Sequence, residues 1–229
     1  ALVQLKKEGM KKLILDLRNN PGGLLTQAVD ICNLFLEKET TIVSTKGKLK
    51  EWNATYKALN PSWDTQLPLL VLINQNSASA AEIVAGVLQD YDRATVVGQR
   101  SFGKGLVQVT RDLPYRAKIK ITTAKYYIPS GRCIQAIDYS DKKDTTKQEF
   151  KTRNGRKVNA GGGIEPDVFV GRPQANSLTQ QLLKEKIFFQ YARLYKLKHP
   201  QIAAAASFHL NEGEYEEFVQ WVKASQFSF

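Results

Sequence analysis

The chain has 229 residues, 42% of them hydrophobic, and a formal net charge of +11, which suits one sizeable domain with a buried core, alone or with a helical appendage. Two cysteines, and two histidines that both lie near the C-terminus, are too few for a disulfide framework, a zinc site or a Ser-His-Asp triad at the glycine-rich turns. No nucleic-acid motif and no interleaved aromatic residues accompany the lysine clusters, so the positive charge indicates a solvated basic surface and no nucleic-acid partner.

The first hundred residues alternate predicted strands and helices. The apolar run at 11–17 ends in the turn RNNPGG, as is typical of a buried strand that feeds a tight turn. Residues 46–66 are polar and are expected to form a surface excursion. The alternation implies parallel βαβ units joined by right-handed crossovers. Strands are predicted at 11–17, 41–45, 67–74 and 94–98, and helices at 24–36 and 79–89.

The pattern changes after residue 105. Alternating apolar and polar residues predict antiparallel strands at 106–113 and 117–128. The fold class predicted for this part of the chain is therefore α/β, with an antiparallel extension added to the βαβ core.

The end of the chain is predicted to be helical. Ser177 and Gln180 fit a capping box that opens a helix reaching about Lys198, and a last amphipathic helix is expected from Glu214 to Ala224. We therefore expect a core domain over residues 1–173 and a helical region over residues 174–229.

Ser79 is a candidate nucleophile. It follows a predicted buried strand and opens a predicted helix, so the backbone N–H groups after it have no helical acceptor, and the helix dipole favours negative charge there. A serine in this place can attack a carbonyl whose developing oxyanion faces those N–H groups. Ser79 and Glu82 also fit a capping box, and the residues alone leave this structural role open.

The segment GQRSFGKG at 98–105 has two interpretations. Gly98 to Lys104 matches the phosphate-binding pattern G-x-x-x-x-G-K, but that pattern needs a serine or threonine next and then a helix. Here Gly105 and the strand-like run LVQV follow, so nucleotide binding stays only an alternative. The second interpretation makes Lys104 a general base, because a desolvated amine is partly neutral at pH 7 and can take a proton from serine. An exposed loop lysine is the ordinary structural alternative, and the residue taken alone favours it.

Two further sets of residues complete the predicted chemistry. Gln108 lies on the same side of a strand as Lys104, so its amide can orient the lysine amine. Gly22 and Gly23 precede a helix, and an N–H of either can point at an oxyanion. Each residue also has an ordinary structural role: a polar side chain on a wet strand face, or a Pro-Gly turn. Because glycine stiffens the backbone little, we expect the Lys104 loop to be the least fixed part of the site.

The order and spacing of these motifs resemble the carboxyl-terminal processing peptidases, also called tail-specific proteases. The resemblance covers about residues 5–170 and rests on the segments LILDLRNNPGG, NxxSASAxE, GxxxFGKGLVQ, TTAKYYIPSGRxIQ and GGGIxPD. It implies that Ser79 is the nucleophile, Lys104 the base and Gln108 the residue that holds the lysine. It also implies an oxyanion hole made by Gly22 or Gly23 together with the N–H of Ala80.

The resemblance further implies a crotonase-like α/β core with an inserted PDZ domain, which captures substrate C-termini by strand addition. No PDZ domain is recognisable in this sequence, and by the family's order it would precede Ala1. The implied function is a serine endopeptidase that cleaves protein substrates near their C-termini through an acyl-enzyme, without a cofactor or a metal, in the bacterial periplasm or cell envelope. Membrane association through a preceding segment, assembly into a homo-oligomer and a non-catalytic peptide-binding role stay open.

Overall fold

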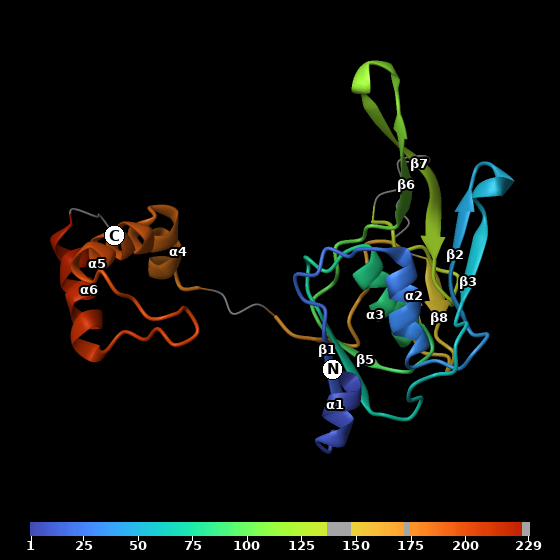
Figure 1. The fold of residues 1–229 in the computed structure, drawn as a ribbon, viewed down its shortest axis with the longest axis horizontal. Helices are drawn as coiled ribbons and strands as arrows, with labels where there is room; N and C mark the ends of the chain where they lie inside the picture. Colours follow the sequence, from blue (N-terminus) through green and yellow to red (C-terminus); the bar gives the residue numbers. More distant parts are fainter. Residues whose placement is uncertain (137–147, 172–174, 226–229) are drawn as a thin grey trace. The chain divides into compact units, whose positions relative to one another are not determined.

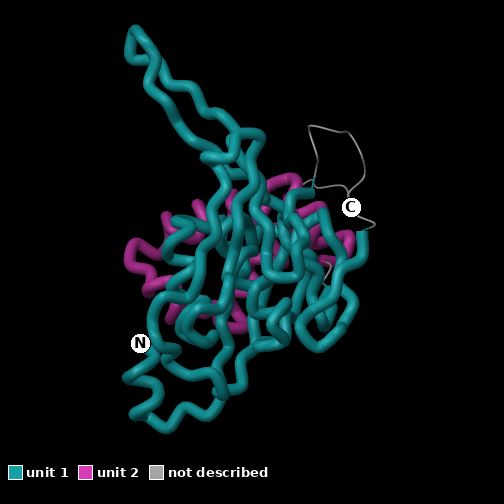
Figure 2. Tube along the Cα trace, turned by 90° about the vertical axis from the view of Figure 1, so that its right-hand side faces the viewer, with its two compact units in different colours: residues 1–171 teal, residues 172–229 magenta. Residues whose placement is uncertain are grey.

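The computed structural model describes residues 1–136, 148–171 and 175–225. The chain forms two compact units, residues 1–171 and 172–229 (Figure 2). The domain boundary predicted between residues 173 and 174 falls outside the described residues. No described helix is both long enough and apolar enough to cross a lipid bilayer.

A four-stranded parallel sheet forms one layer of the first unit. Its strand order is β1-β4-β5-β10, and every neighbouring pair is parallel. Its strands are β1 (Leu13–Asp16), β4 (Leu69–Ile73), β5 (Thr95–Gly98) and β10 (Val168–Phe169). No residue of β1 is buried, because β1 lies at the end of the strand order, so the prediction of a buried strand at 11–17 is wrong for this strand. The helices α2 (Leu25–Asn33) and α3 (Ala80–Asp90) contact each other, and their apolar residues share one core with β4 and β5. Every residue of α3 is buried, so the helix that begins after Ser79 lies inside the domain.

An antiparallel sheet forms the second layer, with the strand order β3-β2-β7-β6. The prediction that residues 41–45 belong to a parallel βαβ unit is wrong. Residues 46–66, expected to be only a surface excursion, supply β3, which pairs with β2 as a hairpin and draws it into the antiparallel sheet. Its strands are β2 (Thr41–Gly47), β3 (Ala54–Lys57), β6 (Leu106–Asp112) and β7 (Lys118–Tyr127). The hairpin of β6 and β7 projects well beyond the sheet (Figure 1).

The remaining short elements of the first unit lie at its periphery. They are α1 (Leu2–Lys7), the 3₁₀ turns η1 (Lys50–Trp52) and η2 (Pro114–Arg116), and the hairpin strands β8 (Glu149–Lys151) and β9 (Lys157–Asn159). Together the two sheets and the helices confirm the predicted α/β class with an antiparallel extension.

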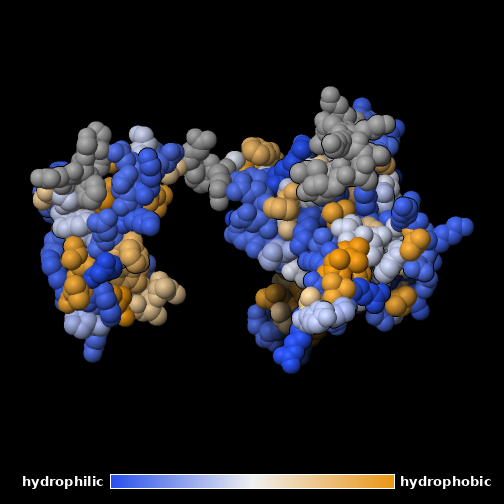
Figure 3. Space-filling view, turned by 90° about the horizontal axis from the view of Figure 1, so that it is seen from above, coloured by the Kyte–Doolittle hydropathy of each residue, from blue (hydrophilic) through white to orange (hydrophobic). Residues whose placement is uncertain are grey.

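The second unit is helical, as expected: α4 (Ser177–Lys184), α5 (Ile187–Lys198) and α6 (Glu212–Ala224). The single helix predicted from Ser177 to Lys198 is wrong, because Lys186 adopts a left-handed backbone (φ 56°) that separates α4 from α5. The cap also differs by one position: the side chain of Asn176, not Ser177, accepts the N–H of Thr179. Among residues 175–225, only a small apolar cluster is buried, and many apolar side chains lie on the surface of this unit (Figure 3).

Candidate active site

Ser79 stands where β4 leads into α3, and its backbone is strained. It is the N-cap residue of α3 with φ 57° and ψ −119°, a conformation that non-glycine residues adopt rarely and that costs on the order of 1–3 kcal/mol. Serine nucleophiles at strand-to-helix turns are often presented by such a strained backbone. The side chain is half-buried, and the residue before it, Ala78, is buried.

Hydrogen bonds to the end of β1 hold this strained turn in place. The Ser77 hydroxyl, fully buried, donates to the Leu17 carbonyl at 2.7 Å and accepts the Asn74 N–H at 2.9 Å. The Ala78 N–H donates to the Asn20 carbonyl at 2.9 Å. The turns that follow β1 and β4 are therefore joined directly, and these hydrogen bonds hold the strained Ser79 backbone in place.

Gly22 lies directly against the nucleophile turn. A methyl group at its Cα would lie 2.8 Å from the Ala80 nitrogen and 2.9 Å from the Ser79 Cβ, and its φ is +94°, so only glycine fits here. Its N–H donates to the Asn20 Oδ1 at 2.9 Å. Among the described residues, by contrast, the N–H groups of Gly23 and Ala80 have no acceptor. The structure thus leaves two free donors, one on the residue after Ser79 and one on the residue after Gly22, which packs against Ser79.

Glu82 connects the nucleophile turn to the Lys104 loop. Its carboxylate is fully buried and accepts four hydrogen bonds: from the N–H of Ser79 (2.8 Å), the hydroxyl of Ser101 (2.5 Å), the N–H of Gly103 (2.6 Å) and the N–H of Lys104 (2.8 Å). Burial raises the pKa of the Glu82 carboxyl, while the four donors act in the opposite direction. The sequence identifies Glu82 only as the partner of Ser79 in a capping box. Of the two capping-box hydrogen bonds, the one from the Ser79 N–H to the Glu82 carboxylate is formed, whereas the serine hydroxyl makes no capping hydrogen bond.

The Lys104 loop has a fixed backbone and an exposed side chain. Besides the bonds to Glu82, the Gly105 N–H donates to Gln135 Oε1 at 2.7 Å and the Gly103 carbonyl accepts the Ala136 N–H at 2.9 Å. Side-chain and backbone groups from outside the loop therefore bond its backbone, while the Lys104 side chain extends into solvent. The Lys104 amine makes no hydrogen bond to Ser79 or to Gln108 within the described part of the chain.

Gln108 lies on β6 with its side chain exposed. Its amide nitrogen lies 3.4 Å from the hydroxyl of Thr122 on β7, at the limit of a hydrogen bond. In the described part of the chain, the Gln108 amide therefore makes no hydrogen bond to the Lys104 amine. Residues after Gly105 form β6, so no helix begins behind the segment 98–105 and the P-loop alternative is wrong.

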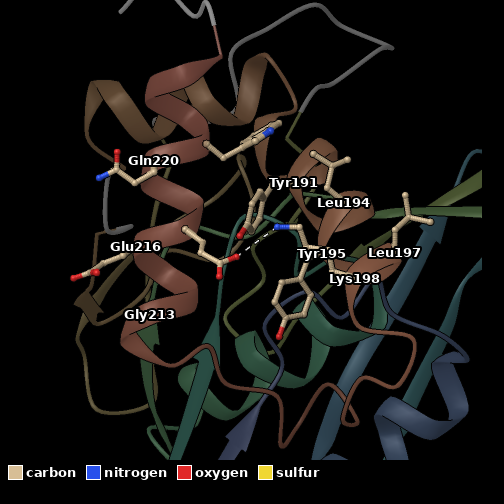
Figure 4. A pocket seen from close by; sticks show the side chains of 10 residues that line it. Tyr191, Leu194, Tyr195, Leu197, Lys198, Gly213, Glu216 and Gln220 are labelled. Carbon is tan, nitrogen blue, oxygen red and sulfur yellow. Dashed lines mark ion pairs between the residues drawn. The ribbon is translucent and has the colours of Figure 1, made fainter.

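A small apolar cavity of about 170 Å³ opens beside the two turns. Gly23 and Ala80 lie on its wall, which also includes the polar residues Asn20 and Gln27. Most of the lining is aliphatic: Leu17, Leu24, Ala28, Ile31, Ala81 and Val84. A larger cavity of about 580 Å³ lies in the helical unit (Figure 4). Tyrosines, leucines and the ion pair Lys198–Glu217 (3.6 Å) line it, but no serine or cysteine does, so it offers no nucleophile.

Metal ligands do not gather in the described part of the chain. No cluster of three or more histidine, cysteine, aspartate or glutamate side chains occurs among residues 1–136, 148–171 and 175–225. Cys32 is fully buried, and burial raises the pKa of its thiol, so it behaves as a small apolar core residue.

Comparison with known proteins finds two family matches. Residues 1–142 match the model of peptidase family S41, and residues 178–229 match that of the C-terminal helical domain of a probable PDZ-protease. Probable CtpA-like serine proteases from Staphylococcus epidermidis and from Staphylococcus aureus (strain COL) are each 38% identical over 180 residues, which are 78% of this chain and 31% of theirs. The chain thus spans about a third of the length of the curated relatives it matches.

Solved structures show the same relationship. The photosystem II D1 C-terminal processing protease superposes with a TM-score of 0.58 at 31% identity, over 74% of this chain and 37% of that one. A putative S41 protease from Bacteroides fragilis, at 17% identity and a TM-score of 0.52 over 73% of this chain and 40% of its own, shares the fold. The chain belongs to peptidase family S41.

Proposed function

We propose that this chain carries the catalytic centre of a serine endopeptidase that cleaves protein substrates near their C-termini, with Ser79 as nucleophile and Lys104 as general base. The observation that supports this most is the strained Ser79 at the N-terminus of a buried helix, flanked by the free N–H groups of Ala80 and Gly23. Membership of family S41 and the CtpA-like relatives support the peptide bond as the target.

The chemistry proceeds in two halves. The Ser79 Oγ attacks the scissile carbonyl carbon while its proton passes to the Lys104 Nζ, and the negative oxygen is held by the N–H groups of Ala80 and Gly23. The tetrahedral intermediate then collapses: the C–N bond breaks, Lys104 returns the proton to the leaving amine, and the acyl group remains on Ser79. Water repeats the sequence and releases the acid.

Of the two glycines predicted for the oxyanion hole, the contacts favour Gly23. The Gly22 N–H is already bonded to Asn20, whereas the Gly23 N–H is free among the described residues. Gly22 contributes differently, because the missing side chain lets its backbone pack against Ser79 and Ala80.

The Lys104 side chain has to move before catalysis. Its backbone is fixed beside the nucleophile turn through Glu82, but its amine is exposed and unbonded to Ser79. The arrangement is that of a resting site, which becomes active when the amine rotates onto the Ser79 hydroxyl and Gln108 follows it, since catalytic hydrogen bonds often tighten only in the substrate complex.

The substrate is held on the acyl side by the small apolar cavity. Its aliphatic lining and volume of about 170 Å³ favour an uncharged aliphatic residue before the scissile bond. The location in the bacterial periplasm or envelope, capture of substrate C-termini, membrane association and a homo-oligomeric state remain predictions from the resemblance.

The test is acylation by a fluorophosphonate probe, read by mass spectrometry of the labelled peptide, together with hydrolysis of an aliphatic peptide ester. Wild type should be labelled at Ser79. The S79A, K104A and K104R variants should lose labelling and hydrolysis, because a guanidinium stays protonated and cannot accept the serine proton. Labelling of another serine, or activity in K104R, would remove these residues from the mechanism. No labelling of a folded full-length wild-type protein would favour the non-catalytic peptide-binding role.

A further inference from the structure

One buried carboxylate joins the two segments that carry the proposed nucleophile and base. The Ser79 N–H and the Lys104 N–H donate to the same oxygen, Glu82 Oε2, each at 2.8 Å. The other oxygen, Oε1, accepts from Ser101 and Gly103. Ser79 and Lys104 lie 25 residues apart in the sequence, but one oxygen atom holds both of their backbone N–H groups.

Few other hydrogen bonds connect the Lys104 loop to the turn that carries Ser79. The remaining anchors of the loop run elsewhere: Gly105 and Gly103 bond to residues 135 and 136, and the Ser101 N–H donates to the Ile164 carbonyl. One further hydrogen bond, from the Phe102 N–H to the Ser77 carbonyl at 2.9 Å, links the loop to the nucleophile turn, but it involves neither Ser79 nor Lys104.

We propose that Glu82 is a positioning residue of the catalytic centre: its carboxylate fixes the Lys104 backbone against the Ser79 backbone and so sets the point from which the lysine amine reaches the serine hydroxyl. The inference rests on the proposed function for its catalytic meaning. Its structural part, the joint fixing of two backbone N–H groups, stands on the contacts alone.

The donor set requires a carboxylate. Three of the four partners are backbone N–H groups, which can only donate, so both oxygens of Glu82 have to accept. A glutamine has the same shape but replaces one oxygen by an NH₂ group, which can only donate. If the NH₂ group replaces Oε2, the N–H groups of Ser79 and Lys104 both face another donor inside a buried site. If it replaces Oε1, the Gly103 N–H faces another donor, while the Ser101 hydroxyl can turn to accept. The replacement thus loosens either the Ser79–Lys104 pair or the contact of Gly103, the neighbour of Lys104.

Asp90 offers a matched control in the same helix. It is the last residue of α3, its side chain is 1% exposed, and its carboxylate accepts the Ser130 N–H at 2.9 Å and pairs with Arg132 at 2.9 Å. It is thus another buried carboxylate with a structural network, but it lies at the opposite end of the helix from Ser79 and contacts neither catalytic segment. D90N therefore measures how much stability is lost with a buried carboxylate when neither Ser79 nor Lys104 loses a hydrogen bond.

The experiment compares wild type, E82Q and D90N in the full-length protein. We expect E82Q to lower kcat and the rate of Ser79 labelling by on the order of 100-fold with KM unchanged, since a misplacement of about 1 Å has that effect. D90N should lower Tm but keep kcat within about twofold. If E82Q keeps wild-type kcat and labelling, or if both variants lose activity in proportion to their loss of Tm, the proposal is wrong.

A second measurement does not depend on activity. Hydrogen exchange followed by NMR should show lost protection of the Ser79 and Lys104 amides, or of the Gly103 amide, in E82Q, and retained protection of all three in D90N. Unchanged protection of all three amides in E82Q would overturn the proposal even if activity fell. If E82Q does not fold, E82D, which keeps the charge but shortens the side chain by one methylene, is judged by the same criteria. Absence of Ser79 labelling in wild type would instead defeat the proposed function.

Discussion

A methyl group added at Gly22 tests how closely the NPGG turn packs against the nucleophile. In G22A the new Cβ would lie 2.6 Å from the Ala78 carbonyl oxygen, 2.8 Å from the Ala80 nitrogen and 2.9 Å from the Ser79 Cβ. Backbone atoms account for two of these contacts, so the turn itself has to shift. The positive φ of +94° adds a cost of its own.

The size of the effect follows from these two terms. The left-handed conformation costs a residue with a Cβ about 1–2 kcal/mol, and overpacking at a rigid contact costs about 1–3 kcal/mol more. G22A should therefore lower the free energy of unfolding by about 2–5 kcal/mol. Gly155 isolates the first term, because its φ is +84° but no atom lies within 4 Å of the place that a methyl group would take there. G155A should cost only about 1–2 kcal/mol.

Urea unfolding followed by tryptophan fluorescence measures both values. A Trp221→Phe background leaves Trp52 and Trp63, so that the signal comes from the first unit alone. The slope of free energy against urea should stay constant, because a change of slope would mean a changed unfolded or native state. If G22A lies within about 0.5 kcal/mol of G155A, the close approach between the two turns is not present in solution and the reasoning is refuted.

Three other predictions concern different parts of the first unit. Arg132→Met should cost about 3–5 kcal/mol in urea unfolding, since it leaves the buried Asp90 without its cation; a loss below about 1 kcal/mol would contradict this. The hydrogen bond from Lys6 lowers the pKa of Asp64 to about 2 from 3.8, so the stability that Asp64 provides is complete above pH 3.8 and is lost as the pH falls through 2. D64N should remove this pH dependence of the urea midpoint. An identical pH profile in wild type and D64N would contradict the prediction. Ala28→Leu should fill the small cavity and so lower kcat/KM about 10-fold more for peptides with leucine before the scissile bond than for peptides with alanine there. Equal losses of kcat/KM for the two peptides would count against the cavity as the binding site.

The sequence predicts the buried part of the fold well because buried strands have a strong local pattern. The run at 67–74 is almost continuously apolar and becomes β4, which lies between two strands and is largely buried. The run at 11–17 has a similar pattern but becomes β1 at the end of the strand order, where no residue of the strand is buried, so the local pattern misled there. The sequence does not predict the two-residue strand β10, since Val168 and Phe169 are 50% and 72% exposed and show no alternation. The sequence also does not predict which sheet β2 joins, because tertiary contacts decide which strands pair and no local pattern records them.

The candidate site shows the same division. A serine that follows a buried strand and opens a helix can be recognised from the sequence, and the structure places Ser79 there. The second role of Glu82 could not be recognised, since three of its four partners come from residues 101–104, which approach α3 only after the chain has folded. For Lys104 the sequence leaves two possibilities, a desolvated base and an exposed loop lysine, because no local pattern records how a side chain rotates; the structure has the side chain exposed.

The small core of the helical unit has a consequence for how the protein can be divided. Only Leu182, Ile187 and Val222 are buried among the described hydrophobic residues there, supported by stacked aromatic rings such as Phe188 and Phe218 at 5.7 Å. A domain of about 60 residues buries only about 60% of the surface its unfolded chain exposes, so a unit with so few buried side chains has little stability in reserve. A fragment that ends before this unit keeps a complete core and should express as a folded protein, whereas the helices produced alone should melt at low temperature and be cut readily by proteases.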